Sequence, residues 1–335
     1  MSVSTRGALV LSLDFELHWG VRDHTDVTAP ALRGAREAVA RLLDVFTARG
    51  VACTWATVGL LFAPTREEQR AASPAARPDY LKPALDAYSQ TVGGDEAEDP
   101  VHFAPSLIAE IAAAPRQELA THTFSHYYCG EPGATPETFR ADLLAAQAIA
   151  DRPLRSIVFP RNQSGPDYVA VLPEVGIDVF RGNPAGWIWR AEEGAAGRHW
   201  ARRIGRLFDT YVPVAKQGSV PWASILRPDG LADVRASRFL RPHDPRLVVL
   251  EPLRLRRITK GMEGAAQRGH VYHLWWHPHN FGIHLEENLR VLGQVLDAWE
   301  RLRDEYRLES LTMAEAADRA RELHGCSCVV SPANA

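Results

Sequence analysis

Residues 8–16 read ALVLSLDFE, an apolar run that ends in two carboxylates. Such a run predicts a strand buried on both faces, as in a parallel sheet. Because side chains alternate along a strand, Asp14 and Glu16 should share one face while Phe15 lies on the other. The stretch therefore predicts a core strand that presents two acidic groups at its carboxyl end.

The rest of the chain alternates between helical and strand-like segments. Apolar residues recur at helical spacing in 31–50, 106–114, 135–151, 253–269, 286–307 and 314–325. Strand-like runs occupy 51–59, 117–122, 155–163, 177–184, 270–280 and 308–313. About seven strand–helix units predict an α/β fold, a distorted (β/α) barrel of about seven parallel strands with insertions.

Two segments interrupt this alternation. Residues 64–105 are rich in proline and contain the acidic run GDEAED, which predicts a surface insertion with a short helix near 79–90. This insertion is either a wall of the substrate site or a solvated decoration, and the sequence leaves both open. Residues 185–250 read as an irregular insertion. We expect one catalytic barrel over 1–325 and a flexible tail over 326–335.

Composition narrows the class of protein. With 335 residues, 46% of them hydrophobic, the chain can bury a large core. A net charge of -3 without a basic stripe argues against nucleic acid as a partner. The first apolar run is interrupted by Asp14 too early for a signal peptide or a membrane span. We therefore expect a cytoplasmic protein without membrane insertion; its oligomeric state is not predicted.

Reactive side chains follow several of the predicted strands, namely Asp14, His122, Arg161 and His277. In a parallel barrel the carboxyl ends of the strands surround the active site. His126 follows His122 by four residues in ATHTFSHYY, a spacing that lets two imidazoles bind one metal ion. The strand ends therefore predict an enzyme, while a metal site and a chance spacing among 13 histidines both stay open for the histidine pair.

Four of these strand ends, LSLDFE, THTFSH, FPRNQ and LWWHPHN, occur in the order of the motifs of the polysaccharide deacetylase superfamily. The chain resembles these metal-dependent carbohydrate N-deacetylases over roughly residues 8 to 320. The resemblance implies a divalent metal ion, with zinc expected and cobalt, nickel or iron as alternatives. It also implies that His122 and His126 are ligands, while Ser125 stiffens their loop by hydrogen bonding.

The first motif departs from the family pattern, because Phe15 stands where the family has a metal-binding aspartate. The shared strand face makes Glu16 the expected third ligand and leaves Asp14 as the catalytic base. The reverse assignment, with Asp14 as the ligand, stays open. The sequence alone does not decide between them.

The resemblance also implies the roles of the remaining site residues. His277 would be the general acid, and Arg161 would hold Asp14 ionised and oriented. His273 would support the site from behind. The expected substrate contacts come from Trp19, Asn162, Gln163, Leu274, Trp276 and His279, with Leu274 lining the pocket for the acetyl methyl group.

The resemblance therefore implies hydrolysis of an N-acetyl amide on an N-acetylated amino sugar or glycan intermediate. One alternative keeps the fold and the metal but acts on a non-sugar amide, ureide or formamide. Another is a catalytically inactive barrel that binds glycan, which only the presence of Phe15 supports. The exact substrate is not predicted.

Overall fold

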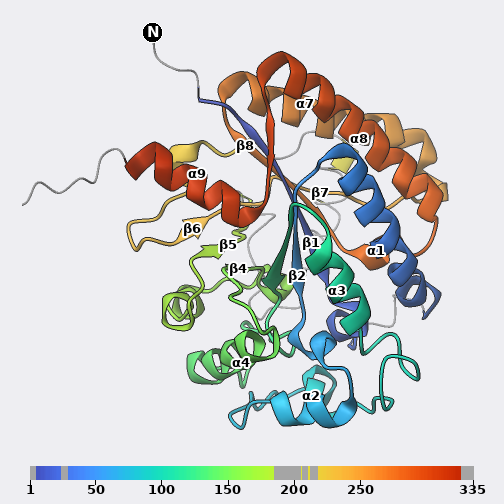
Figure 1. Cartoon of the computed structure of the whole chain (residues 1–335), viewed down its shortest axis with the longest axis vertical. Helices are drawn as coiled ribbons and strands as arrows, with labels where there is room; N and C mark the ends of the chain where they lie inside the picture. Colours follow the sequence, from blue (N-terminus) through green and yellow to red (C-terminus); the bar gives the residue numbers. More distant parts are fainter. Residues whose placement is uncertain (1–4, 24–28, 185–204, 206–209, 212–217, 326–335) are drawn as a thin grey trace, which may run out of the picture.

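The computed structural model describes residues 5–23, 29–184, 205, 210–211 and 218–325. Within these ranges the fold is a curled parallel sheet with helices packed around it, a distorted half-barrel (Figure 1). The strands are β1 (Ala8–Phe15), β2 (Cys53–Thr57), β3 (Gln117–Thr121), β4 (Ser156–Ile157), β5 (Val179–Phe180), β6 (Ala232–Asp233), β7 (Arg238–Phe239), β8 (Val271–Trp276) and β9 (Glu309–Leu311). The predicted α/β class is confirmed.

The strands are hydrogen-bonded in the order β6-β5-β4-β3-β2-β1-β8-β7, and β9 pairs with β1. All ladders between these strands are parallel. Over the residues that the structure describes, the sheet has nine strands where the sequence predicted about seven. Both extra strands, β6 and β7, have only two residues each and lie in the region read as irregular, so they carry too little periodicity to be recognised.

Helices cover the outer face of the sheet, as Figure 1 shows. Their bounds are α1 (Ala29–Arg49), α2 (Arg66–Ala72), α3 (Pro105–Ala113), α4 (Pro136–Ile149), α5 (Pro166–Val169), α7 (Glu251–Arg268), α8 (Leu285–Tyr306) and α9 (Met313–Gly325). None of the helices that the structure describes is both long and apolar enough to cross a lipid bilayer.

Strand β1 lies at the centre of the sheet. One of its edges pairs with β8 over Ala8 to Leu13. The other edge pairs with β9 over Ala8 to Val10 and with β2 over Ser12 to Phe15. Strands β9 and β2 therefore pair with successive parts of the same edge of β1. The Ala52 N–H, just before β2, donates to the hydroxyl of Ser310 in β9.

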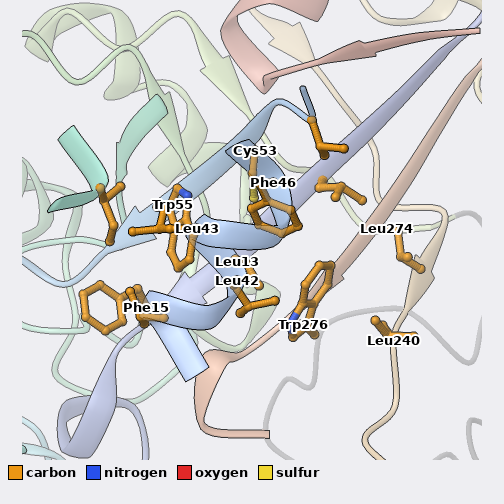
Figure 2. Close-up of a cluster of buried hydrophobic side chains, with 14 of the residues drawn as sticks. Leu13, Phe15, Leu42, Leu43, Phe46, Cys53, Trp55, Leu240, Leu274 and Trp276 are labelled. Carbon is orange, nitrogen blue, oxygen red and sulfur yellow. The ribbon is translucent and has the colours of Figure 1, made fainter. Parts of the chain in front are cut away.

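The two faces of β1 have different surroundings. Leu9, Leu11, Leu13 and Phe15 belong to the large core between sheet and outer helices, together with residues such as Phe46 (Figure 2). On the inner face, Ala8 and Val10 pack in a second cluster that includes Met313 and Ala316 of α9. The inner positions beyond them are Ser12 and Asp14, both buried. The inner face thus changes from apolar to polar toward the carboxyl end.

The 64–105 segment folds against the region that follows β1. The expected short helix near 79–90 is replaced by two 3-10 turns, Pro83–Leu85 and Ala87–Ser89, while the regular helix of the segment is α2. Prolines limit the helix here because they lack the N–H that helical hydrogen bonds need. The Arg22 guanidinium donates to the Leu85 carbonyl oxygen, at 2.6 Å from Nη2, and so ties the segment to the chain after β1.

Helix α1 approaches the loop after β8 closely at Gly34. A Cβ atom on Gly34 would lie 2.1 Å from the carbonyl oxygen of Gly282. A Cβ atom on Gly293, inside α8, would meet no neighbouring group within 4 Å. The two glycines therefore form a matched pair, both helical but with different space around them.

We expect Gly34→Ala to destabilise the protein by about 1–3 kcal/mol, because the added methyl group must push α1 away from the loop. Gly293→Ala should stabilise it by about 0.5–1 kcal/mol, since alanine loses less backbone entropy in a helix. Urea unfolding followed by circular dichroism measures both. Equal changes in the free energy of unfolding of the two variants would contradict the close contact between Gly34 and Gly282.

Candidate metal and catalytic site

Three predicted metal ligands lie together at the carboxyl end of the sheet. Glu16 follows β1, and His122 and His126 lie in the loop after β3. Glu16 Oε2 is 3.2 Å from His122 Nε2 and 3.1 Å from His126 Nε2. All three side chains are buried, and their ligand atoms lie within 4.8 Å of one another. The group can hold a metal ion.

The hydrogen bonds around these residues fit a bound cation. His122 Nδ1 lies 2.8 Å from the Val158 carbonyl oxygen and must donate to it, which leaves Nε2 as the ring nitrogen that faces Glu16 and can bind a metal ion. Burial lowers the pKa of His126 to about 3, which keeps that ring neutral. Two imidazoles and one carboxylate are a donor set that divalent transition metals bind.

Gly20 makes room for the Glu16 carboxylate. A Cβ atom at this position would lie 2.0 Å from Glu16 Cδ and 2.3 Å from both of its carboxylate oxygens. The 3-10 turn Leu17–Gly20 thus folds back over the acidic side chain that precedes it. A residue with a side chain here would have to displace the carboxylate.

The loop that carries both histidines is fixed from behind by Asp142 of α4. Its carboxylate accepts hydrogen bonds from the N–H of Phe124 at 2.6 Å, and from the N–H and hydroxyl of Ser125 at 3.1 and 2.5 Å. Burial raises the pKa of Asp142 to about 6. Ser125 thus donates to Asp142 from both its N–H and its hydroxyl. Sequence reasoning missed Asp142, because it lies in a helix more than 15 residues away with no motif around it.

Asp14 is paired with an arginine that the sequence analysis did not select. Arg181 Nη1 and Nη2 donate to the two carboxylate oxygens of Asp14 at 2.6 and 2.7 Å, and both side chains are buried. Burial by itself would raise the pKa of Asp14, but the charge of Arg181, together with the neighbouring His122 and His277, outweighs it and holds this pKa below its ordinary value. Asp14 is thus kept ionised and oriented.

The prediction that Arg161 holds Asp14 is wrong. Arg161 adopts a left-handed backbone conformation, with φ of 53°, in the turn Pro160–Asn162, and its guanidinium pairs with Asp23 and Glu131. Arg181 instead follows β5 directly, in VFRGN, and reaches Asp14 across the inner face of the sheet. Arg181 could have been selected by the criterion that selected Arg161, namely a reactive side chain directly after a predicted strand.

His273 is linked to this ion pair by hydrogen bonds through Ser12. Its Nδ1 lies 2.9 Å from the Val234 carbonyl oxygen and its Nε2 lies 2.8 Å from the Ser12 hydroxyl. The same hydroxyl lies 3.0 Å from Arg181 Nη1. Burial lowers the pKa of His273 to about 3, so the ring is neutral. A buried hydrogen-bonded chain thus runs from β8 to Asp14.

His277 faces both acidic groups of the first strand. Its Nε2 lies 3.7 Å from Asp14 Oδ2 and 3.7 Å from Glu16 Oε1, and its Nδ1 lies 3.2 Å from Asn280 Oδ1. Its side chain is 22% exposed, so a ligand can reach it. His279 stacks on His277 at 4.9 Å, and its buried Nδ1 lies 3.8 Å from Glu16 Oε1 without a hydrogen-bond partner in the described chain.

Three of the expected substrate contacts do not fit the structure. Leu274 and Trp276 are fully buried in the outer core (Figure 2). The reason is strand alternation, which puts them on the face of β8 opposite His273 and His277. Trp19 is also 1% exposed, and its indole N–H donates to the His102 carbonyl oxygen.

The inner face of β8 instead presents Trp275, which the sequence analysis did not choose. Its ring lies 4.1 Å from the Arg181 guanidinium carbon and 4.7 Å from the Phe239 ring. Asn162 and Gln163 point into the protein, where Asn162 Oδ1 accepts from Arg181 and Gln163 Oε1 accepts from the Gly130 N–H. Their amide oxygens therefore already have protein partners.

Comparison with solved structures identifies the fold class. A Mycobacterium smegmatis protein named as a candidate polysaccharide deacetylase superposes with a TM-score of 0.53 at 14% identity, covering 96% of this chain and 93% of the other. PuuE allantoinase gives 0.53 at 13% identity, covering 98% and 93%. No protein-family profile and no curated protein matches the sequence.

A pseudoenzyme of carbohydrate esterase family 4 from Bacillus anthracis gives a TM-score of only 0.44 at 10% identity, covering 94% of this chain and 67% of the other. At these identities the likeness establishes the fold alone. The chain therefore has the deformed (β/α) barrel of the polysaccharide deacetylases, with a buried Glu–His–His group that can bind metal. The predicted resemblance is confirmed at this level.

We expect Gly20→Ala to lower the affinity for Zn²⁺ by about 10- to 100-fold, because the new methyl group displaces the Glu16 carboxylate. Competition with a chromophoric chelator measures this affinity. Gly293→Ala is the control and should bind Zn²⁺ like the wild type. Wild-type affinity in Gly20→Ala would exclude Glu16 as a ligand in this geometry.

Proposed function

We propose that the protein is a metal-dependent hydrolase that removes the acetyl group from an N-acetylated amino sugar or glycan intermediate. The observation that carries the proposal is the buried Glu16–His122–His126 group, with Asp14 and His277 beside it. Zinc is the proposed metal, because two imidazoles and a carboxylate leave room for water and substrate around it. The proposed location is cytoplasmic.

The residues around the metal group divide the proton transfers between them. A divalent cation bound there supplies Lewis acidity toward an amide carbonyl and lowers the pKa of water. Asp14 accepts a proton from the attacking water, and Arg181 keeps its carboxylate ionised and in place. His277, which is partly exposed, donates a proton to the leaving amine. The 3.7 Å distance from His277 Nε2 to Asp14 Oδ2 leaves both groups within reach of one substrate atom.

The aromatic side chains near His277 support a sugar as substrate. Trp275 and Phe239 are partly exposed, and both rings lie within 6 Å of the His277 ring. Aromatic faces of this kind stack on the apolar faces of sugar rings. Arg161, which Asp23 and Glu131 hold over the Tyr128 ring, is proposed to contact the substrate.

A second candidate is an amidohydrolase that acts on a ureide or another non-sugar amide. It is favoured by the likeness to PuuE allantoinase, which has the same TM-score as the likeness to the Mycobacterium smegmatis protein. A panel of N-acetylated amino sugars, allantoin and simple formamides, assayed by released acetate, ureide cleavage or formate, separates the two. Turnover of allantoin alone would replace the sugar proposal.

We expect Asp14→Asn to retain the metal but to lose turnover by about 10²–10⁴-fold, because the base is removed. Glu16→Gln should lose metal affinity, since an amide is a weaker ligand than a carboxylate. Metal content by mass spectrometry and acetate release from the best substrate of the panel measure both effects. The opposite pattern would make Asp14 the ligand.

If the protein is a catalytically inactive barrel, the metal and turnover measurements on these variants have a third outcome. It would show no turnover on any member of the panel in the metal-loaded wild type. The proposed function would then fail, whichever variant binds metal.

We expect Arg181→Lys to lower kcat by about 10²-fold with little change in KM, because a lysine cannot hold both oxygens of Asp14. Arg161→Gln should mainly raise KM, because its proposed contact is with the substrate. Steady-state kinetics of the two variants measure the contrast. A large loss of kcat in Arg161→Gln with a normal KM would restore the original assignment of Arg161.

A further inference from the structure

The amino-terminal end of the sheet carries a cavity that the proposed reaction does not use. Its volume is about 540 Å³, and it lies where β9 enters the sheet beside β1. Six described segments of the chain line it: the residues before β1, the end of α1, the residue before β3, the end of α8, β9 itself, and α9. A cavity of this size is within the range of about 300–1,000 Å³ that small-molecule sites occupy.

The cavity is lined mainly by arginine. Six guanidinium groups surround it, from Arg6, Arg49, Arg116, Arg303, Arg307 and Arg319. The only acidic residue among the lining residues in the described chain is Glu309. Its carboxylate is shared by two of the arginines, since Oε1 lies 3.3 Å from Arg6 Nη1 and Oε2 lies 3.0 Å from Arg319 Nη2.

Some of these arginines have structural roles that explain their presence. Arg116 donates to the carbonyl oxygens of Gly50 and Ser310, at 2.7 and 2.5 Å, and Arg49 pairs with Asp297 outside the cavity. Basic residues also complement the negative carboxyl ends of α1 and α8.

Structural roles do not account for all of the positive charge. Arg307 is exposed and forms no side-chain hydrogen bond or ion pair with any residue that the structure describes. Arg6 shares the Glu309 carboxylate with Arg319, which also lies 3.8 Å from Glu322 Oε2, although each guanidinium has five N–H donors. The cavity therefore offers donors and charge that the protein itself does not use.

The chemistry of these donors defines the ligand. Planar guanidinium groups bind phosphate oxygens in pairs of parallel hydrogen bonds. Several guanidiniums around a cavity of about 540 Å³ suit an anion with more than one phosphate group better than a single orthophosphate. We propose that this arginine-lined cavity binds a diphosphate group, either as inorganic pyrophosphate or as part of a nucleoside diphosphate.

The cavity lies far from the candidate active site. Strand β1 borders it near Ala8 and carries Asp14 at the other end, a separation of six residues or about 20 Å in an extended strand. Binding there cannot involve the metal group directly. The inference is therefore independent of the proposed function.

Isothermal titration calorimetry of the full chain with pyrophosphate tests the proposal. We expect saturable binding at one site, weakened by added NaCl because the attraction is between charges. The double variant Arg303→Gln/Arg307→Asn should bind at least about 10-fold more weakly. Asparagine is chosen for Arg307 because this position has φ of 57°, which asparagine tolerates.

Glu309→Gln provides the sharper test. Removing the acidic group frees Arg6 and Arg319 for the ligand, so pyrophosphate should bind at least about 3-fold more tightly. A role of these arginines in folding alone predicts no such gain. ADP titrated in parallel shows whether the diphosphate belongs to a nucleotide. Tighter binding of ADP than of pyrophosphate favours a nucleoside diphosphate, and weaker binding favours inorganic pyrophosphate.

Two control variants isolate the cavity. Arg140→Gln removes an exposed arginine of α4 that pairs with Glu174 away from it, and should bind pyrophosphate like the wild type. Glu16→Gln should also bind pyrophosphate with wild-type affinity. This result would exclude pyrophosphate bound by a metal ion at the Glu16–His122–His126 group. Absence of saturable binding below roughly 1 mM, wild-type affinity in the double variant, or no gain in Glu309→Gln would each overturn the proposal.

Discussion

The two-residue alternation of β1 organises the molecule. Leu9, Leu11, Leu13 and Phe15 face the outer helices and belong to the main core. The intervening positions face inward, and they change from the apolar Ala8 to the acidic Asp14 along the strand. Strand β8 pairs with β1 over six residues, so its side chains alternate between the same two faces. His273 and His277 face inward, and Leu274 faces outward.

Burying so many charged and polar groups on the inner face is costly unless each is paired. Asp14 receives two hydrogen bonds from Arg181, whose guanidinium also meets Ser12 and lies against Trp275. The Glu16–His122–His126 group differs, because its three potential ligand atoms lie within 4.8 Å of one another. One cation can be bound by all three side chains at once, whereas the charges of Asp14 and Arg181 already neutralise each other.

The opposite ends of the sheet have opposite chemistry. At the carboxyl ends of the strands, acidic groups and imidazoles surround a place for a cation. At the amino ends, arginines surround a cavity next to β9. Helices around a parallel sheet all point their carboxyl ends toward the amino ends of the strands, which favours basic residues there. The excess of arginine over this structural need is what points to an anion.

The sequence by itself determined the class of fold, the shared face of Asp14 and Glu16, and the convergence of His122, His126 and His277. These follow from local periodicity and from the rule that parallel strands gather their carboxyl ends. Only the tertiary structure decided which arginine meets Asp14, which tryptophan of Trp275 and Trp276 faces inward, and that Asp142 braces the histidine loop. Such partners depend on the curl of the sheet and on the register between strands distant in sequence, which no local pattern encodes.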